Sequence, residues 1–146
     1  MVSGNNFTTT TNLTHSYFIN IPQNWGWATW ASKWLEFEQE LFNEPSFNFP
    51  CGSTLGFLTA GCKRSLRGKI DAWDTVVAYR MYVKNLFCII PPSNIVSNIG
   101  DDEFAQHSNS ADNQINYPIF EISPILENSS QVELNKEVQD FILKKI

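Results

Sequence analysis

Apolar residues recur at helical spacing in the first third of the chain. Over residues 28–41, the apolar positions i, i+4, i+7 and i+11 are Trp30, Trp34, Phe37 and Leu41. This spacing places them on one face of an α-helix, and glutamates occupy the opposite face. We therefore predict an amphipathic helix over residues 28–41, with Trp30 and Trp34 packed in the core.

A second helix is predicted over residues 73–85, where apolar side chains occur on almost every side. A helix of this kind is buried. The β-prone run at residues 86–90 follows it directly, and two prolines end that run, which predicts a short buried strand. A helix followed by a buried strand favours the α/β fold class.

The other segments are predicted from turn residues and caps. Residues 1–24 are rich in Asn and Thr around a short apolar run at 17–19, which predicts loops and short strands. Residues 43–56 contain two prolines and two glycines and are predicted to form a loop. The capping-box pattern Ser130-x-x-Glu133 predicts that a last helix, over about residues 130–145, begins here and docks on the core.

Composition narrows the class of protein. The chain has 146 residues and a net charge of −5 at pH 7, so we expect one domain over residues 1–146 and no nucleic-acid surface. It has no apolar run of 18 residues and no signal-peptide pattern at its start. These observations predict a cytoplasmic protein without a transmembrane segment, with attachment to the inner face of the membrane as an open alternative.

The cysteines do not form a recognisable metal or disulfide pattern. Cys51, Cys62 and Cys88 are an odd number at long spacings, with no C-x-x-C pair. Free and largely buried thiols are therefore expected.

Five short motifs occur in a fixed order between residues 2 and 108. They are Val2-Ser3-Gly4-Asn5-Asn6-Phe7, Trp25-Gly26-Trp27-Ala28-Thr29-Trp30, Trp73-Asp74, Asn94-Ile95-Val96-Ser97-Asn98-Ile99-Gly100 and Ala105-Gln106-His107. Together they resemble S-G-x-x-F, W-G-W-A-T-W, W-D, N-L-V-S-N-I-G and A-T-H, which occur in this order in the C-terminal half of inverting nucleotide-sugar glycosyltransferases of the family 2 type.

The resemblance implies an α/β fold that corresponds to the acceptor-side, C-terminal half of the GT-A fold. The N-terminal half of such enzymes holds the nucleotide and the D-x-D carboxylates, and it is absent from this sequence. The implied function is transfer of a sugar from a nucleotide-diphosphate donor to a glycan or lipid-linked acceptor with inversion. The chain alone is expected to be inactive. It resembles a split, truncated or excerpted gene product, and a separate N-terminal half as partner is one of the open alternatives.

Two positions depart from the family pattern. Asp101 and Asp102 follow N-I-G where the family carries an aromatic residue, and Gln106 replaces the threonine of A-T-H. Both departures lie beside the histidine that the resemblance connects with a metal.

Inverting transfer needs a general base and a group that holds the departing diphosphate. Asp74 opens the predicted helix, where the helix dipole favours a carboxylate, and it matches the acidic position of the family's base. Asp74 is therefore the candidate catalytic base, Asp71 is the second candidate, and a plain N-cap or first-turn acid is the alternative. His107 is the candidate ligand for Mg²⁺ or Mn²⁺ in the complete enzyme, with a loop histidine bonded to backbone as the alternative.

Trp25 and Trp27 flank Gly26, where a backbone can approach closely, and indole faces stack on the C–H faces of sugars. Trp73 stands beside Asp74. Trp25, Gly26, Trp27 and Trp73 are therefore the candidate substrate-binding residues. Core packing is the alternative for each tryptophan, and the competing function is a non-catalytic carbohydrate-binding or interaction module, or a decayed remnant.

Two further groups have structural and functional interpretations. Lys63, Arg64, Arg67 and Lys69 form a basic cluster, which either neutralises a diphosphate or membrane phosphate or is a solvated helix face. Asn94 is expected to hydrogen-bond the backbone of its own loop.

Overall fold

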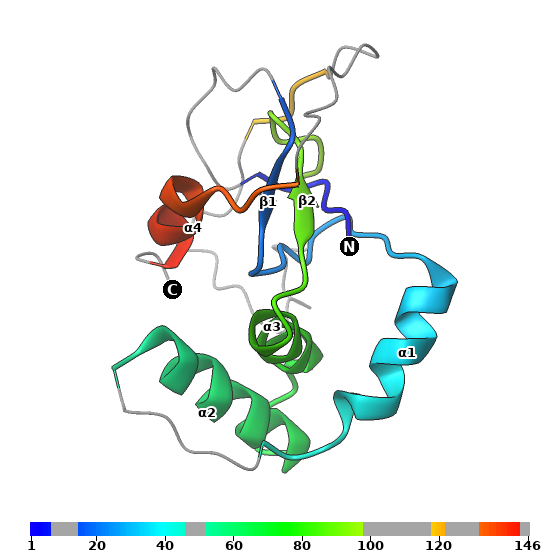
Figure 1. Ribbon diagram of the computed structural model, residues 1–146, viewed down its shortest axis with the longest axis vertical. Helices are drawn as coiled ribbons and strands as arrows, with labels where there is room; N and C mark the ends of the chain where they lie inside the picture. The colour runs from blue at the N-terminus through cyan, green and yellow to red at the C-terminus, as the bar shows by residue number, and fades with distance from the viewer. Residues whose placement is uncertain (7–14, 46–51, 98–117, 122–131, 144–146) are drawn as a thin grey trace, which may run out of the picture.

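The structure is a computed structural model that describes residues 1–6, 15–45, 52–97, 118–121 and 132–143. These residues form a mixed α/β arrangement of four helices and a two-stranded sheet (Figure 1). The elements, in chain order, are β1 (Tyr17–Ile19), α1 (Ala31–Leu41), α2 (Thr54–Leu66), α3 (Trp73–Val83), β2 (Cys88–Ile90) and α4 (Lys136–Leu143). The expected α/β class is confirmed at this level.

β2 lies at the centre of the strand pairing. It pairs antiparallel with β1, where Phe18 is opposite Ile89, and Val2 bridges Ile89 in parallel on the other edge of β2. Val2 also bridges Ala28, and Phe18 bridges Leu134. Segments from the start, the middle and the end of the chain are thus joined through backbone hydrogen bonds to one short pair of strands.

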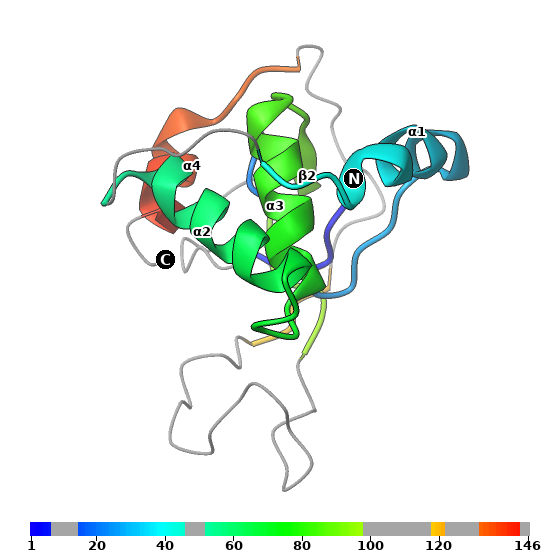
Figure 2. The same cartoon turned by 90° about the horizontal axis from the view of Figure 1, so that it is seen from below.

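α3 is the central helix of the molecule. Five of the six residues from Val76 to Met81 in α3 are buried, which confirms the prediction of a buried helix. α2 packs along one side of α3 (Figure 2). Ile19 of β1 and Ile90 of β2 have no exposed surface, so the core lies between the two strands and α3.

α1 stands apart from α2 and α4 on one side of the molecule (Figures 1 and 2). Leu41 is buried, and Trp34 and Phe37 pack against the core, as the periodicity predicts. The prediction for Trp30 is wrong, because its side chain is 58% exposed. The helix begins at Ala31, and Trp30 is its N-cap with extended backbone, so the indole leaves the helical face that the spacing assumed.

α2 corrects the end of the loop that was predicted over residues 43–56, because the helix includes residues 54–56; residues 46–51 lie outside the described residues. Its first turn begins at Thr54, where the Ser53 hydroxyl accepts a hydrogen bond from the Gly56 amide at 3.0 Å. Further along α2, Gly61 has a packing role. A Cβ there would lie 3.3 Å from the Thr75 Cβ, so glycine permits the close approach of α2 and α3.

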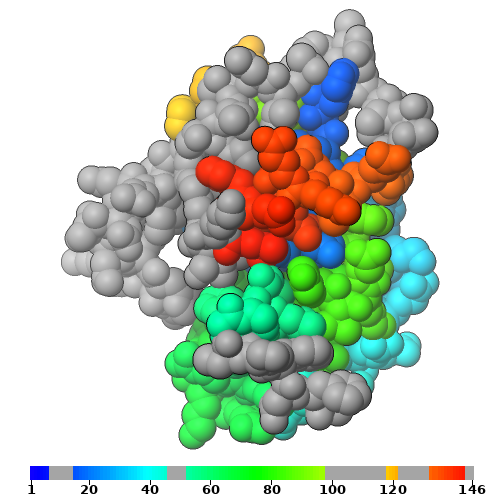
Figure 3. Space-filling model, turned by 60° about the vertical axis from the view of Figure 1, so that its left-hand side comes forward, coloured from blue at the N-terminus to red at the C-terminus, as the bar shows by residue number. Residues whose placement is uncertain are grey.

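α4 begins later than the capping box suggested. It begins at Lys136, and the Asn135 side chain accepts a hydrogen bond from the Val138 amide at 3.1 Å. Asn135 is thus the cap, and Ser130 lies outside the described residues. α4 docks on the core as expected, with Ile142 buried, and it packs against β1; in the space-filling view it also lies beside the start of α2 (Figure 3).

The two described cysteines are buried in the core. Cys62 of α2 and Cys88 of β2 are free and have no exposed surface, which confirms the prediction for these two; Cys51 lies outside the described residues. Burial raises the pKa of both thiols above their ordinary value of 9.0.

The raised thiol pKa values predict a loss of stability in alkali. Above pH 9.0 the unfolded chain releases thiol protons that the folded chain retains, so the free energy of unfolding falls as the pH rises. Each thiol contributes a slope of up to about 1.4 kcal/mol per pH unit. Guanidinium unfolding at about pH 7.5 and about pH 9.5 measures the loss, and Cys62→Ala should make it smaller. An unchanged or higher midpoint at the alkaline pH would contradict the prediction.

Candidate functional site

Three of the five sequence motifs meet at Val96. A Cβ on Gly26 would lie 2.4 Å from the Val96 Cγ1, and a Cβ on Gly4 would lie 2.6 Å from the same atom. The Gly4 amide also donates to the Gly26 carbonyl at 2.9 Å. Gly26 has a φ of +58°, which favours glycine. The close approach at Gly26 is therefore made by Val96 of the same chain.

Buried asparagines hold the same junction together. The Asn6 amide donates to the Asn94 side chain at 3.2 Å, and the Asn6 side chain donates to the Pro91 carbonyl at 2.8 Å. The Tyr17 hydroxyl donates to the Asn6 side-chain oxygen at 2.8 Å. Asn94 itself donates to the Val96 carbonyl at 2.7 Å, which confirms its expected role within the loop.

Trp27 connects the W-G-W motif to the W-D motif. Its ring centroid lies 5.7 Å from that of Trp73 and 5.8 Å from that of Trp34, and both pairs are tilted. Trp34 continues to Phe37 at 6.1 Å. We name these four rings, Trp73, Trp27, Trp34 and Phe37, the aromatic row. Trp73 is 50% exposed, so one end of the row faces solvent.

Asp74 lies in the first turn of α3, directly after the exposed ring of Trp73. The N-cap is Ala72, so the structural alternative that fits Asp74 is the first-turn acid and not the N-cap. The Asp74 Oδ1 accepts a hydrogen bond from the Thr75 amide at 2.9 Å. Among the described residues no other hydrogen bond to this half-buried carboxylate is recorded, so its second oxygen can accept a proton. Asp71 is exposed and precedes the helix.

The other predicted site residues are only partly placed. Trp25 is half-buried beside Gly26. His107, Asp101 and Asp102 lie outside the described residues. The described part of the chain contains no cluster of three or more histidine, cysteine, aspartate or glutamate side chains that fits a metal ion.

A groove of about 350 Å³ separates the start of α1 from the end of α3 and the start of β2. Its lining is mostly apolar and is completed by a few charged side chains: Met1, Trp27, Thr29, Trp30, Lys33, Trp34, Glu36, Phe37, Met81, Lys84, Leu86 and Phe87. Trp73 and Asp74 do not line the groove, whereas Trp27 does. Trp27 therefore belongs both to the groove and to the surroundings of the W-D motif.

Sequence analysis did not predict this groove. Helical spacing assigned Trp30 and Trp34 to the core, and Lys33 and Glu36 were unremarkable surface charges. The available signal was the third tryptophan of W-G-W-A-T-W, which falls just before the helix rather than within it.

The two lysines that line the groove form ion pairs with glutamates. The Lys33 ammonium lies 3.0 Å from the Glu36 carboxylate within α1. Lys84, at the end of α3, lies 2.6 Å from Glu40, and this hydrogen bond and charge lower the pKa of Glu40. The groove thus has no uncompensated lysine among the side chains that line it.

The basic cluster lies at the end of α2. Lys63 and Arg64 are in its last turn and Arg67 is its C-cap, where the helix dipole favours cations. Arg67 forms an ion pair with Glu44, and both side chains are largely exposed. This placement supports the interpretation of a solvated helix end.

Comparisons with known proteins gave no match: no family model, no curated protein and no solved structure is similar to this chain. Within the described ranges, no helix is both long and apolar enough to cross a bilayer.

Proposed function

We propose that this chain is the acceptor-side half of an inverting glycosyltransferase with a GT-A fold. The complete enzyme would transfer a sugar from a nucleotide-diphosphate donor to a glycan or lipid-linked acceptor at the cytoplasmic side of the membrane. One observation carries the proposal. Trp27 and Trp73, from two motifs far apart in the sequence, have ring centroids 5.7 Å apart, Trp73 is 50% exposed, and Asp74 is the next residue in the first turn of α3.

The geometry supports a role for Asp74 as general base. An acceptor sugar whose C–H face stacks on Trp73 would place a hydroxyl group beside the Asp74 carboxylate. The carboxylate then accepts the hydroxyl proton while the acceptor oxygen forms a bond to the anomeric carbon of the donor. The bond to the diphosphate breaks on the opposite face, so the configuration at that carbon is inverted.

A divalent cation is proposed for the complete enzyme only. Mg²⁺ or Mn²⁺, held by the D-x-D carboxylates of an N-terminal half and by His107, would neutralise charge on the departing diphosphate. The described residues of this chain supply the acceptor surface and the base.

A non-catalytic carbohydrate-binding module is the second candidate. The exposed ring of Trp73 favours it, because an exposed indole binds a sugar whether or not chemistry follows. In that case Asp74 would act only through its bond to the Thr75 amide. The two candidates differ in whether a nucleoside diphosphate is released.

The test is a transfer assay on the chain joined to a nucleotide-sugar-binding half that ends in D-x-D. With Mn²⁺ or Mg²⁺, a panel of nucleotide-diphosphate sugars and neutral acceptor saccharides, we expect release of nucleoside diphosphate that depends on the acceptor. The chain alone should give no release. A folded, donor-binding fusion that transfers no sugar would contradict the enzyme and favour the binding module.

A further inference from the structure

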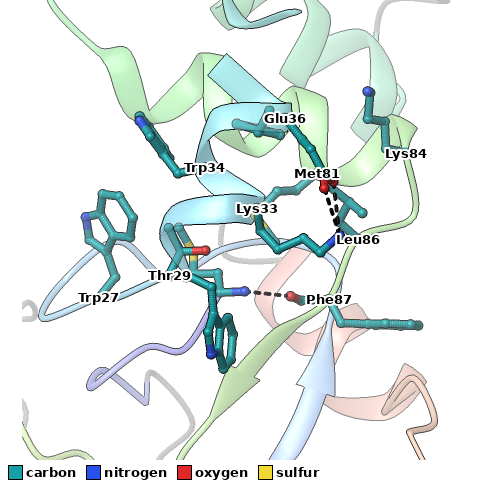
Figure 4. Close-up of a pocket in the computed structure, with 12 residues that line it drawn as sticks. Trp27, Thr29, Lys33, Trp34, Glu36, Met81, Lys84, Leu86 and Phe87 are labelled. Carbon is teal, nitrogen blue, oxygen red and sulfur yellow. Dashed lines mark hydrogen bonds and ion pairs between the residues drawn. The ribbon is translucent and has the colours of Figure 1, made fainter. Parts of the chain in front are cut away.

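The groove beside α1 has two different ends. The indoles of Trp27 and Trp34 lie on one side of α1, and the Lys33–Glu36 ion pair lies on the other side, beside Leu86 (Figure 4). Trp30 lines the groove and is 58% exposed, so its ring can contact a ligand. The groove therefore offers flat apolar surfaces together with donors and acceptors, within the usual size range of ligand pockets.

Charge pairing selects the kind of ligand. Lys33 is paired with Glu36 and Lys84 with Glu40, and the Met1 ammonium donates to the Phe87 carbonyl at 3.3 Å, so an anion would have to compete with an existing partner of each cation. A simple alkyl chain would form no hydrogen bonds with the ion pairs at the rim or with the Thr29 hydroxyl. A neutral saccharide matches both ends of the groove. Its C–H faces stack on the indoles, and its hydroxyl groups form hydrogen bonds with the paired charges without replacing either charged partner.

Ring contacts link the groove to the helix turn that carries the proposed base. The aromatic row runs from Trp73, beside Asp74, through Trp27 to Trp34 and Phe37, with successive centroids 5.7, 5.8 and 6.1 Å apart. Trp73 lies outside the groove, whereas the other three rings line it. A sugar chain that is stacked at Trp73 can therefore continue along the row into the groove.

We propose that the groove between α1 and the α3–β2 connection binds the non-reacting sugars of a neutral acceptor oligosaccharide, with Trp30 and Trp34 as stacking surfaces. This subsite rests on the proposed function for the identity of its ligand as an acceptor. Saccharide binding itself does not require Asp74. Trp30 is the specificity residue that the proposal singles out, because its ring is exposed rather than part of the core.

The experiment is a titration of the full chain with neutral trisaccharides of glucose, galactose, mannose and N-acetylglucosamine, followed by the indole N–H resonances in NMR spectra. At least one trisaccharide should shift the resonances of Trp30 and Trp34. Trp30→Ala should weaken its binding about tenfold or more, which is a typical loss for one stacked aromatic side chain. Because Trp30 is exposed, this variant should fold normally.

Phe42→Ala is the matched control, since Phe42 is an exposed aromatic residue at the end of the same helix and does not line the groove. It should bind the trisaccharide as the wild type does. The proposal is overturned if no trisaccharide shifts the groove resonances, if 1-octanol shifts them in place of saccharides, or if Trp30→Ala binds as tightly as the wild type.

Asp74→Asn separates this subsite from the proposed chemistry. The variant should keep trisaccharide binding in the groove. If the completed wild-type enzyme binds the trisaccharide but transfers no sugar, the proposed function is contradicted and the subsite is not. Transfer with an acceptor KM that Trp30→Ala does not change would contradict the subsite alone.

Discussion

Asp74→Asn should lower the kcat of the completed enzyme by about 10²–10⁴-fold, the usual contribution of a general base. The amide keeps the size of the side chain but cannot accept the acceptor's proton in the same way. Donor binding and the acceptor KM should change little, because the aromatic row is untouched. Initial rates with saturating donor and varied acceptor, together with donor binding by calorimetry, measure the two effects separately.

Asp71→Asn is the matched control for the base. Asp71 lies three residues earlier in the sequence, and its side chain is exposed outside α3. This variant should retain nearly the wild-type rate. If Asp71→Asn lost the activity and Asp74→Asn kept it, the base would be Asp71. If both variants kept it, neither carboxylate would be the base.

Gly26→Ala should strongly destabilise the fold. The left-handed backbone at a φ of +58° costs about 1–2 kcal/mol for an alanine. The new Cβ would also lie 2.4 Å from the Val96 Cγ1, and overpacking of this kind costs about 1–3 kcal/mol. The expected loss of unfolding free energy is therefore about 2–5 kcal/mol, a large share of a typical domain stability. Chemical denaturation monitored by tryptophan fluorescence measures it.

Two variants separate backbone strain from the clash. Gly68 has a similar φ of +65° with no atom within 4 Å of an added Cβ, so Gly68→Ala should cost only the backbone part. Val96→Ala introduced together with Gly26→Ala should recover most of the clash part. Equal losses for Gly26→Ala and Gly68→Ala would show that the packing of Gly26 on Val96 is not as described.

The periodicity of the sequence predicted the elements whose apolar faces are buried. α3 is apolar on nearly all sides and is the buried centre, and the Trp34–Leu41 face of α1 packs on the core. The sequence did not predict α2, because this helix depends on tertiary contacts with another helix. Gly61 lowers the helix propensity of this segment but permits close contact with Thr75 of α3. Packing against α3 compensates for the lower propensity.

The sequence predicted individual residues of the candidate site but not the groove beside them, which depends on tertiary structure. The motifs identified Trp27, Trp73 and Asp74 as residues of interest, and the structure brings the two indoles into contact. The groove depends on where α1 begins. A shift of the helix start from residue 28 to Ala31 moves Trp30 from the core face to the groove, and periodicity does not define a helix start to within one turn.

The most direct test of the central claim is the anomeric configuration of the product in the transfer reaction described above. Proton NMR of the reaction mixture distinguishes the two anomers at early times. A single displacement assisted by Asp74 predicts a product linkage opposite in configuration to the donor linkage, formed about 10²–10⁴-fold more slowly by Asp74→Asn. A product that retains the donor configuration, or an inverted product formed equally fast by Asp74→Asn, would contradict the account.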